Sequence, residues 1–396
     1  MQNANLKVLS AQEPSPEPDS APIHATPGEA CAAPLQESHR FTFTGSGKEY
    51  FRIWIVNLCL SIATLGIYSA WAKVRRQQYF HRNTQLGGAV FDFHGDPKTI
   101  LKGRALGVIL LATYHYAFGF SKIFGIAVVC LMLLSLPWMM RSALRFRLRN
   151  TSYRGLRFDF GGSVLGAYRC YFPVMLLIFV PTAMVATDPT LFKWFWLSFL
   201  LYLGWPLLHA SIRRYQHSHL EYGASRALYS ASAGDFFAIY FFAALIGFFA
   251  VAISGALIAL AAVAVGNTLP AKFVFWVPIG MTITLMYFSY LLSGPYLQTR
   301  IFNLAWCGTR FPNLDIQSDL SAKAYIKLQT LNAIFTLLSL GLYRPFAVVR
   351  AYRYRLAHMS VRTVGAFDHL LSGERRRAGG AGGDGAADFL GIDLSW

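Results

Sequence analysis

Charged residues are scarce in this sequence, and acidic residues are the scarcest among them. Only 14% of the 396 residues are charged, whereas about a quarter of the residues of a soluble domain usually are. Hydrophobic residues make up 55% of the chain, and the mean hydropathy is +0.39. This balance excludes a water-soluble domain as the main part of the molecule, because most of its surface needs an apolar solvent.

The sequence also lacks the patterns that accompany disulfide frameworks, zinc sites and common catalytic centres. Its five cysteines are scattered and include no C-x-x-C pair. H-E-x-x-H and G-x-S-x-G do not occur, and residues 45–48 depart from a phosphate-binding loop at two defining positions. The His and acidic residues at 92–96 and 217–221 are interpreted as ordinary polar residues rather than metal ligands. We therefore expect no enzyme, no catalytic residues, no metal and no cofactor.

Basic residues outnumber acidic ones by 36 to 19, which gives a net charge of +17. They lie in short connectors between apolar segments. This is typical of residues next to a membrane rather than of a soluble module that binds nucleic acid. We therefore expect the lipid bilayer and anionic lipids as partners and no nucleic acid, and a protein partner or a homo-oligomer stays open.

Apolar segments follow one another along most of the chain, and about 20 such residues cross a bilayer. Six are predicted to be full spans: 105–120, 123–140, 164–186, 191–211, 236–263 and 273–297. Two more segments, 53–72 and 325–347, lie near the ends and are each interrupted by a glycine. The predicted fold class is an all-α polytopic membrane protein with six to eight membrane helices.

Alternate connectors are rich in Lys and Arg, which places them in the cytoplasm by the positive-inside rule. These connectors are 73–104, 141–163, 212–235 and 298–324. If 53–72 crossed the membrane fully, the polar tail before it would have to be exported without a signal peptide. We therefore predict that 53–72 and 325–347 are re-entrant or interfacial helical hairpins. Both termini are then cytoplasmic.

Related sequences recur in and around the basic connectors. Residues 83–95 recur at 150–162, with partial copies at 41–46 and 314–318. The two end segments also match each other at an offset of 275 residues, from Lys48/Lys323 to Tyr79/Tyr354. These matches indicate internal duplication of one building unit.

Each copy predicts a short cytoplasmic β-hairpin followed by a capped helix. Phe-x-Phe has a period of two residues, and so do Arg145–Arg149 and Tyr352–Leu356. The alternative is that the basic stretches merely extend the membrane helices inward. Helix starts are predicted at Ser46 with Glu49, at Asp96-Pro97 and at Ser163.

Polar residues within the apolar segments are the first candidates for function, because burying them in lipid is costly. Asn57 and Asn332 occupy equivalent positions, which suggests one shared role: a bond across the related segments or a polar lining between them. His115 is interpreted first as hydrogen-bonded between helices, with a ligand or proton-path role as the alternative.

Arginines near the predicted cytoplasmic surface form the second set of candidates, because anionic lipid headgroups attract basic residues there. We predict that they bind headgroups or other anions. The set comprises Arg75, Arg76, Arg145, Arg147, Arg149, Arg350, Arg353 and Arg355.

Several of these stretches together resemble the YjgN-like family of bacterial inner-membrane proteins, which carry a domain of unknown function. The likeness covers roughly residues 41–393. It implies an inner-membrane location and no established activity, so no catalytic residue can be carried over. The stretches are Phe41-x-Phe43-x-Gly45, Leu65–Ala72 into Arg75-Arg76, Asn83-Thr84 into Phe91–Phe93, and Leu340–Phe346 with Arg350 and Tyr354.

The predicted organisation is a disordered Pro/Ala/Glu-rich tail at 1–40, a YjgN-like transmembrane domain of repeated units at 41–371 and a flexible Gly-rich tail at 372–396. Three classes of function compete. A permease or channel-like transport protein is favoured by several spans, duplication and broken helices. The alternative is a membrane scaffold or subunit that recruits a partner or anionic lipid through its basic face. The lack of acidic or His clusters at depth argues against an intramembrane enzyme.

Overall fold

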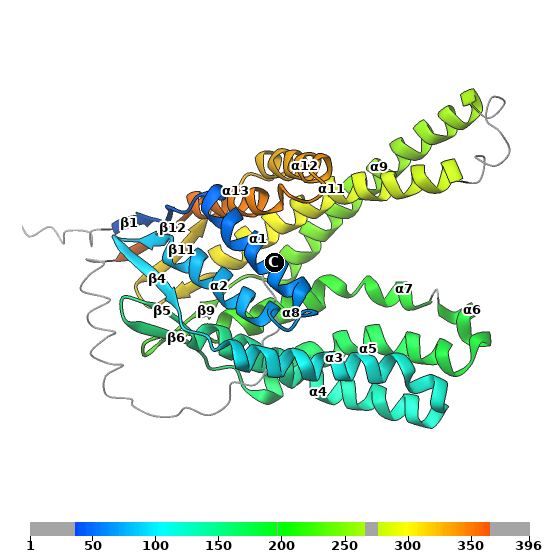
Figure 1. Ribbon diagram of the computed structural model, residues 1–396, viewed down its shortest axis with the longest axis horizontal. Coiled ribbons are helices and arrows are strands. Elements are labelled where there is room, and N and C mark those ends of the chain that lie inside the picture. The colour runs from blue at the N-terminus through cyan, green and yellow to red at the C-terminus, as the bar shows by residue number, and fades with distance from the viewer. Residues whose placement is uncertain (1–35, 196, 266–275, 365–396) are drawn as a thin grey trace, which may run out of the picture. The chain divides into compact units, whose positions relative to one another are not determined.

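The computed structural model describes residues 36–195, 197–265 and 276–364, and within them the chain is mostly helical (Figure 1). Residues 1–35 of the predicted N-terminal tail and all of the predicted tail at 372–396 lie outside the described residues. Residues 36–40 form strand β1 (Gln36–Arg40), so the predicted tail ends five residues too late. These residues are ordered because β1 pairs along its length with β12 (Met359–Val364).

The helices occur in pairs, and strands connect each pair to the next. The pairs are α1 (Gly47–Ala63) with α2 (Ser69–Arg82), α3 (Pro97–Phe120) with α4 (Lys122–Arg149), α5 (Val164–Thr187) with α8 (Trp205–Ser218), α9 (Ala233–Val265) with α11 (Trp276–Cys307), and α12 (Ala322–Leu338) with α13 (Arg344–Ala357). Between α5 and α8 lie η1 (Pro189–Leu191), α6 (Phe192–Phe195) and α7 (Leu197–Tyr202). Each pair packs against the next, and α13 packs against α1, so the helix contacts form a closed circuit.

Among the described residues, three helices are long and apolar enough to cross a membrane: Lys122–Arg149, Val164–Thr187 and Ala233–Leu260. The predicted helical membrane class is thus confirmed, whereas these helices do not establish six to eight spans. The predicted span 191–211 is not one continuous helix, since α7 ends at Tyr202 and α8 begins only at Trp205. Gly204 and Pro206 explain this break, because proline lacks the N–H that a continuous helix needs.

The strands form two antiparallel sheets. One has the order β1-β12-β11-β10-β9, with β11 at Leu314–Ser318, β10 at Thr309–Phe311 and β9 at Leu228–Tyr229. The other has the order β2-β3-β4-β5-β6-β7-β8. Its strands are β2 (Thr42–Phe43), β3 (Thr84–Leu86), β4 (Ala89–Phe93), β5 (Thr151–Tyr153), β6 (Leu156–Phe160), β7 (Leu220–Tyr222) and β8 (Ser225–Arg226).

The two sheets are joined at both ends and share one core. A single residue, Phe41, separates β1 from β2, and Ala227 separates β8 from β9. Strands of both sheets contribute to one apolar cluster of Leu86, Tyr153, Leu156, Tyr222 and Val361. The Tyr153 hydroxyl donates to the carbonyl of Leu86 at 2.6 Å, and the Tyr222 hydroxyl donates to the carbonyl of Tyr153 at 3.2 Å. The strand segments therefore enclose a common apolar core.

The local signals at helix starts and hairpin turns are confirmed. Ser46 and Glu49 form a capping box, and Asp96 and Ser163 accept N–H bonds at the starts of α3 and α5. Ser121 separates α3 from α4 and caps α4. At the turn between β3 and β4, Gly87 and Gly88 have φ of 51° and 75°, which glycine adopts without a steric penalty.

Two predicted strands are wrong. Residues 145–149 belong to α4 and residues 352–356 to α13, and the strands β5 and β12 begin only after each helix ends. An alternation over five residues also fits one helical turn. Arg145 and Arg149, four positions apart, both reach Asp159 on β6. The helix ends at Asn150, whose side chain donates to the carbonyl of Phe146 at 2.8 Å.

The first and last helix pairs turn in the same way. Leu65 and Leu340 both have φ of 49°, and Gly66 and Gly341 have φ of 90° and 92°. In both turns the glycine N–H bonds the carbonyl five residues earlier at 2.7 Å, which is the Schellman closure. The leucines are 96% and 94% exposed. Both end segments are therefore helical hairpins with an apolar side chain at the tip.

Candidate anion-binding site

A groove of about 560 Å³ lies between α1 and α2 and is rich in arginine. Its α1 wall consists of Arg52, Ile53 and Val56. Its other wall consists of Arg75, Gln78, Tyr79, Arg82 and Asn83. The groove thus joins a cationic side to an apolar one, and no acidic residue lines it.

Helical spacing and the cap of α1 build the groove. Arg52 and Val56 are four residues apart on α1, and Arg75, Tyr79 and Arg82 follow at helical spacing on α2, so each set shares one helix face. The Tyr79 hydroxyl donates to the carbonyl of Ser46 at 2.8 Å, which ties α2 to the start of α1. Burial, and then the negative charge of Glu49, raises the pKa of Tyr79 to about 12, so its hydroxyl stays a donor at neutral pH.

One of the three arginines is neutralised. Arg82 Nε donates to Asp92 Oδ1 at 2.8 Å. Burial acts to raise the pKa of Asp92, but the bonds from Arg82 and from the Phe93 N–H outweigh it and the pKa is lowered. Arg75 lies over the Tyr68 ring, 5.8 Å from its centroid, and the described residues give neither Arg52 nor Arg75 an acidic partner. The groove therefore has two uncompensated positive charges.

A basic side chain lies at the same distance from the helix start in the first helix of four of the helix pairs. Each lies six residues after the N-cap of its helix, so each projects from the second helical turn. All of them are exposed. We call this set the basic belt: Arg52 on α1, Lys102 on α3, Arg169 on α5 and Lys327 on α12. This spacing was not predicted, although the constant distance from each cap is visible in the sequence.

The predicted headgroup arginines do not form one site. Arg75, Arg76 and Arg350 are exposed, whereas Arg147 is half-buried. The remaining four are held by the protein itself. Arg149 Nε bonds Asp159 Oδ1 at 2.8 Å, with Arg145 Nε 3.9 Å from the same oxygen.

Contacts between distant parts of the chain hold the other two arginines. Arg353 donates to the carbonyl of Gly45 at 2.7 Å, and Arg355 donates to the Tyr325 hydroxyl at 2.6 Å. These residues therefore connect elements of the protein.

The intramembrane candidates fall in two different environments. Asn57 and Asn332 are 7% and 3% exposed, and their Oδ1 atoms have no hydrogen-bond partner among the described residues. Asn332 Nδ2 donates to the carbonyl of Ala347 at 3.3 Å, so it bonds within its own hairpin rather than across the related segments. His115 is exposed on α3, and its ring contacts the Tyr116 ring edge-on. The prediction of a hydrogen bond from His115 to another helix is therefore wrong for the described residues.

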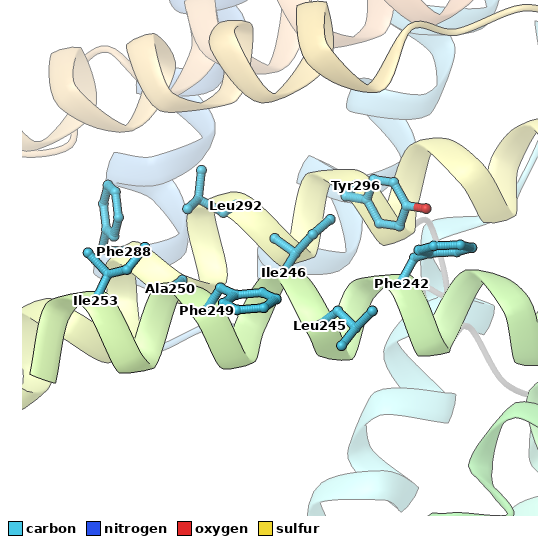
Figure 2. Close-up of a pocket in the computed structure, with 9 residues that line it drawn as sticks. All are labelled: Phe242, Leu245, Ile246, Phe249, Ala250, Ile253, Phe288, Leu292 and Tyr296. Atoms are coloured by element: carbon cyan, nitrogen blue, oxygen red, sulfur yellow. The ribbon is translucent and has the colours of Figure 1, made fainter.

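A second groove, of about 660 Å³, is apolar (Figure 2). It lies between α9 and α11, where Phe249 and Ile253 of one helix face Phe288 and Leu292 of the other. The hydroxyl of Tyr296 is the one side-chain oxygen among the lining residues. Such a groove suits an acyl chain or an apolar side chain and offers no polar recognition.

A further polar cluster lies along α8 and was not predicted. His209 lies between Tyr240 of α9 and Arg213, one helical turn further along α8. Trp205 also reaches the Tyr240 hydroxyl, at 2.9 Å. The polar positions at steps of four residues were the available signal. In the parts of the chain that the structure describes, no group of three His, Cys, Asp or Glu side chains could hold a metal ion.

Comparison with known proteins points to one family. A family model described as "Bacterial protein of unknown function (DUF898)" matches residues 38–389. Inner membrane protein YjgN of Escherichia coli K12 is 30% identical over 153 residues, and its counterpart from Salmonella typhimurium LT2 is 31% identical over 150 residues. Each match covers 36% of this chain and 36% of the relative, so the chain matches about a third of the length of these curated relatives. No solved structure matches the chain.

Proposed function

We propose a lipid-binding role for this chain, which belongs to the bacterial family of proteins of unknown function DUF898. Its curated relatives are inner membrane proteins, which supports an inner-membrane location. In this role the chain is a membrane scaffold or subunit that holds anionic phospholipid headgroups through the basic belt and the groove between α1 and α2. We assign it no catalytic step.

The proposal includes the finer topology. The strand segments and the basic connectors lie in the cytoplasm, six segments span the membrane, and the α1–α2 and α12–α13 pairs enter it from the cytoplasm and return. Internal duplication of a helix-pair unit accounts for the equivalent turns at Leu65 and Leu340 and for the constant spacing of the basic belt.

The observation that carries the proposal is the pairing of uncompensated charge with apolar surface. Arg52 and Arg75 lack acidic partners among the described residues, while Ile53 and Val56 line the same groove. Exposed Leu60, one helical turn beyond Val56, continues this surface toward the hairpin tip. A phospholipid has the complementary arrangement, with a phosphate next to its acyl chains, and each basic residue near an anionic surface contributes about 1 kcal/mol.

The test is the lipid that co-purifies with the protein. We expect the double variant Arg52→Gln/Arg75→Gln to lose much of its bound phosphatidylglycerol and cardiolipin, measured by mass spectrometry of extracted lipid per mole of protein. Arg310→Gln is the matched control, because Arg310 is exposed on β10, where its Nε lies 3.7 Å from Asp315. An unchanged amount of anionic lipid in the double variant would contradict the proposal.

Transport is the second candidate, and the α8 cluster favours it. His209 and Arg213 lie in or next to the predicted span 191–211, where polar groups usually serve a pathway or a ligand. Flux of anions into proteoliposomes measures this role. Equal flux in wild type and Arg213→Gln would argue against a pathway through this cluster.

A further inference from the structure

The apolar groove between α9 and α11 is as long as one leaflet of a bilayer is deep. Phe242 and Tyr296 lie at one end of it, and Ile253 and Phe288 lie at the other (Figure 2). The helix from 242 to 253 is about 16 Å long at the usual rise per residue. The hydrocarbon core of a bilayer is about 30 Å thick, so one leaflet fills about 15 Å of it. The groove therefore matches the length of an acyl chain in a single leaflet.

The lining combines large exposed side chains with one small buried one. Phe249, Ile253 and Phe288 are exposed, whereas Ala250 is buried. The methyl group of Ala250 leaves open the space between its larger neighbours. The exposed side chains show that the groove is open along its side, so an acyl chain can enter it laterally from the bilayer. α9 is one of the helices long and apolar enough to cross a membrane, which places such chains next to the groove.

A positive charge lies just beyond one end of the groove. Arg300, one helical turn after Tyr296, is exposed, and its guanidinium lies 5.7 Å from the centroid of the Tyr296 ring. The described residues give Arg300 neither an ion pair nor a hydrogen bond. Asp235, the acidic residue in the first turn of α9, instead accepts from the N–H of Ser232 at 2.9 Å. The groove thus ends at an uncompensated cation.

This charged end is the end nearer the strands. Phe242 lies in the part of α9 that follows β9, and Tyr296 lies in the part of α11 that leads to β10. Tyrosine is enriched where a membrane meets water, and an arginine side chain extends from that level to the aqueous phase. Tyr296 and Arg300 therefore suit the interface, and the rest of the groove suits the hydrocarbon core below it.

We infer that the groove binds one acyl chain of an anionic phospholipid whose phosphate lies at Arg300. The guanidinium fork matches two oxygens of a phosphate, and the apolar lining matches the chain attached to it. The second acyl chain remains in the bilayer, because the groove is open along its side. The site lies on α9 and α11, so it extends the proposed lipid-binding role to a second place and rests on that role through the membrane location alone.

The test uses the full chain in lipid nanodiscs that contain a trace of phosphatidylglycerol with a photoreactive diazirine in one acyl chain. Mass spectrometry of the cross-linked peptides measures where the chain lies. We expect labelling at 242–253 and 288–296 to exceed labelling around Leu131 and Leu134, which are exposed on α4 outside the groove. The same probe with a phosphatidylcholine headgroup should label the groove about 5-fold less, as expected for one basic residue at an anionic surface, and label α4 equally.

Three variants separate headgroup, chain and location. Arg300→Gln should lower labelling of the groove by phosphatidylglycerol about 5-fold, whereas Arg300→Lys keeps the charge and should retain most of it. Ile253→Trp fills the end of the groove away from Arg300 and should also lower the labelling. Arg52→Gln/Arg75→Gln should leave it unchanged, because those residues line the other groove. Unchanged labelling of α4 shows that each variant is folded.

The inference is overturned if the groove is labelled no more than α4, or equally by the two phospholipids, or equally in wild type and Arg300→Gln. A diazirine fatty acid that labels the groove more than phosphatidylglycerol does would also overturn it, in favour of a free fatty acid. A groove that stays unlabelled while α4 is labelled would indicate that a protein segment occupies it. Loss of lipid from the groove between α1 and α2 would leave each of these results as it is.

Discussion

His217 is a buried histidine whose hydrogen bond fixes its neutral form. The Thr309 hydroxyl donates to the carbonyl of Ala305 at 2.7 Å, so at 2.9 Å it accepts from His217 Nδ1. Trp306 and Tyr229 pack around the ring, with centroids 5.2 and 5.5 Å away. Burial, and then the charges of Arg213 and Arg147, lowers the pKa of His217 to about 3.

This lowered pKa makes the stability of the protein sensitive to mild acid. The unfolded chain takes up the proton near pH 6.5 and the folded chain does not. The neutral His217 therefore makes its full contribution to the free energy of unfolding above pH 6.5, and this contribution is lost as the pH falls below 6.5. At pH 5 the loss amounts to about 2 kcal/mol. We expect the Tm of wild type to fall between pH 7.5 and 5, and the Tm of His217→Gln to fall less. His115→Gln, at an exposed position, is the control, and equal falls in wild type and His217→Gln would contradict the assignment.

At the scale of elements, substitutions at the two hairpin tips can show whether each tip lies in water or in lipid. Leu65 and Leu340 hold a left-handed backbone conformation that costs a branched side chain about 1–2 kcal/mol. Asparagine adopts this conformation more easily, so Leu65→Asn or Leu340→Asn would stabilise a tip in water. In lipid the loss of a leucine costs about 1.5–3 kcal/mol and outweighs that gain.

We therefore expect both tip variants to lower the Tm in lipid nanodiscs, and to do so by similar amounts. Leu228→Asn provides a control, because Leu228 is exposed on strand β9 rather than at a helix tip. A raised Tm in either tip variant would place that tip in water and would contradict a re-entrant hairpin.

Local signals in the sequence predicted the elements best where one side chain decides the structure. The caps at Ser46 and Asp96 and the break at Ser121 each depend on a hydrogen bond within a few residues. Arg145–Arg149 was assigned wrongly because its helix continues through packing of Phe146 against Ala70, Val74 and Ile100, which are distant in sequence. Strand β1 was missed because its order comes from β12, more than 300 residues away. For the candidate site, Arg75 was found from charge alone, but its groove partner Arg52 depends on how α1 packs on α2.

At the scale of the whole molecule, one prediction concerns the side of the membrane. The strand segments connect every helix pair, so they must all lie on one side if the pairs enter the membrane from it. The excess of Lys and Arg in these connectors predicts that this side is the cytoplasm. We expect GFP fused before Met1 or after Trp396 to fluoresce, and alkaline phosphatase fused after Thr187 to be active. Active phosphatase at either terminus, with dark GFP, would restore a model of eight full spans.

The pairing of β1 with β12 gives the chain a cyclic order. Gln36 lies opposite Val364, just as the residues on either side of each hairpin turn lie opposite each other. A short linker from 364 to 36 would therefore create one more hairpin, and the chain could be opened at another turn, such as Gly87-Gly88. We expect such a circular permutant, from Gly88 round to Gly87, to keep the helix content of the unpermuted 36–364 chain by circular dichroism, and its Tm within a few degrees.

A permutant that fails to fold while the 36–364 control folds would show that the order of membrane insertion matters as well as the final contacts. A permutant that folds would mean that any of the helix pairs can be made first. The native contacts would then specify a loop without a preferred starting point, and the order of synthesis would be free to vary among related chains.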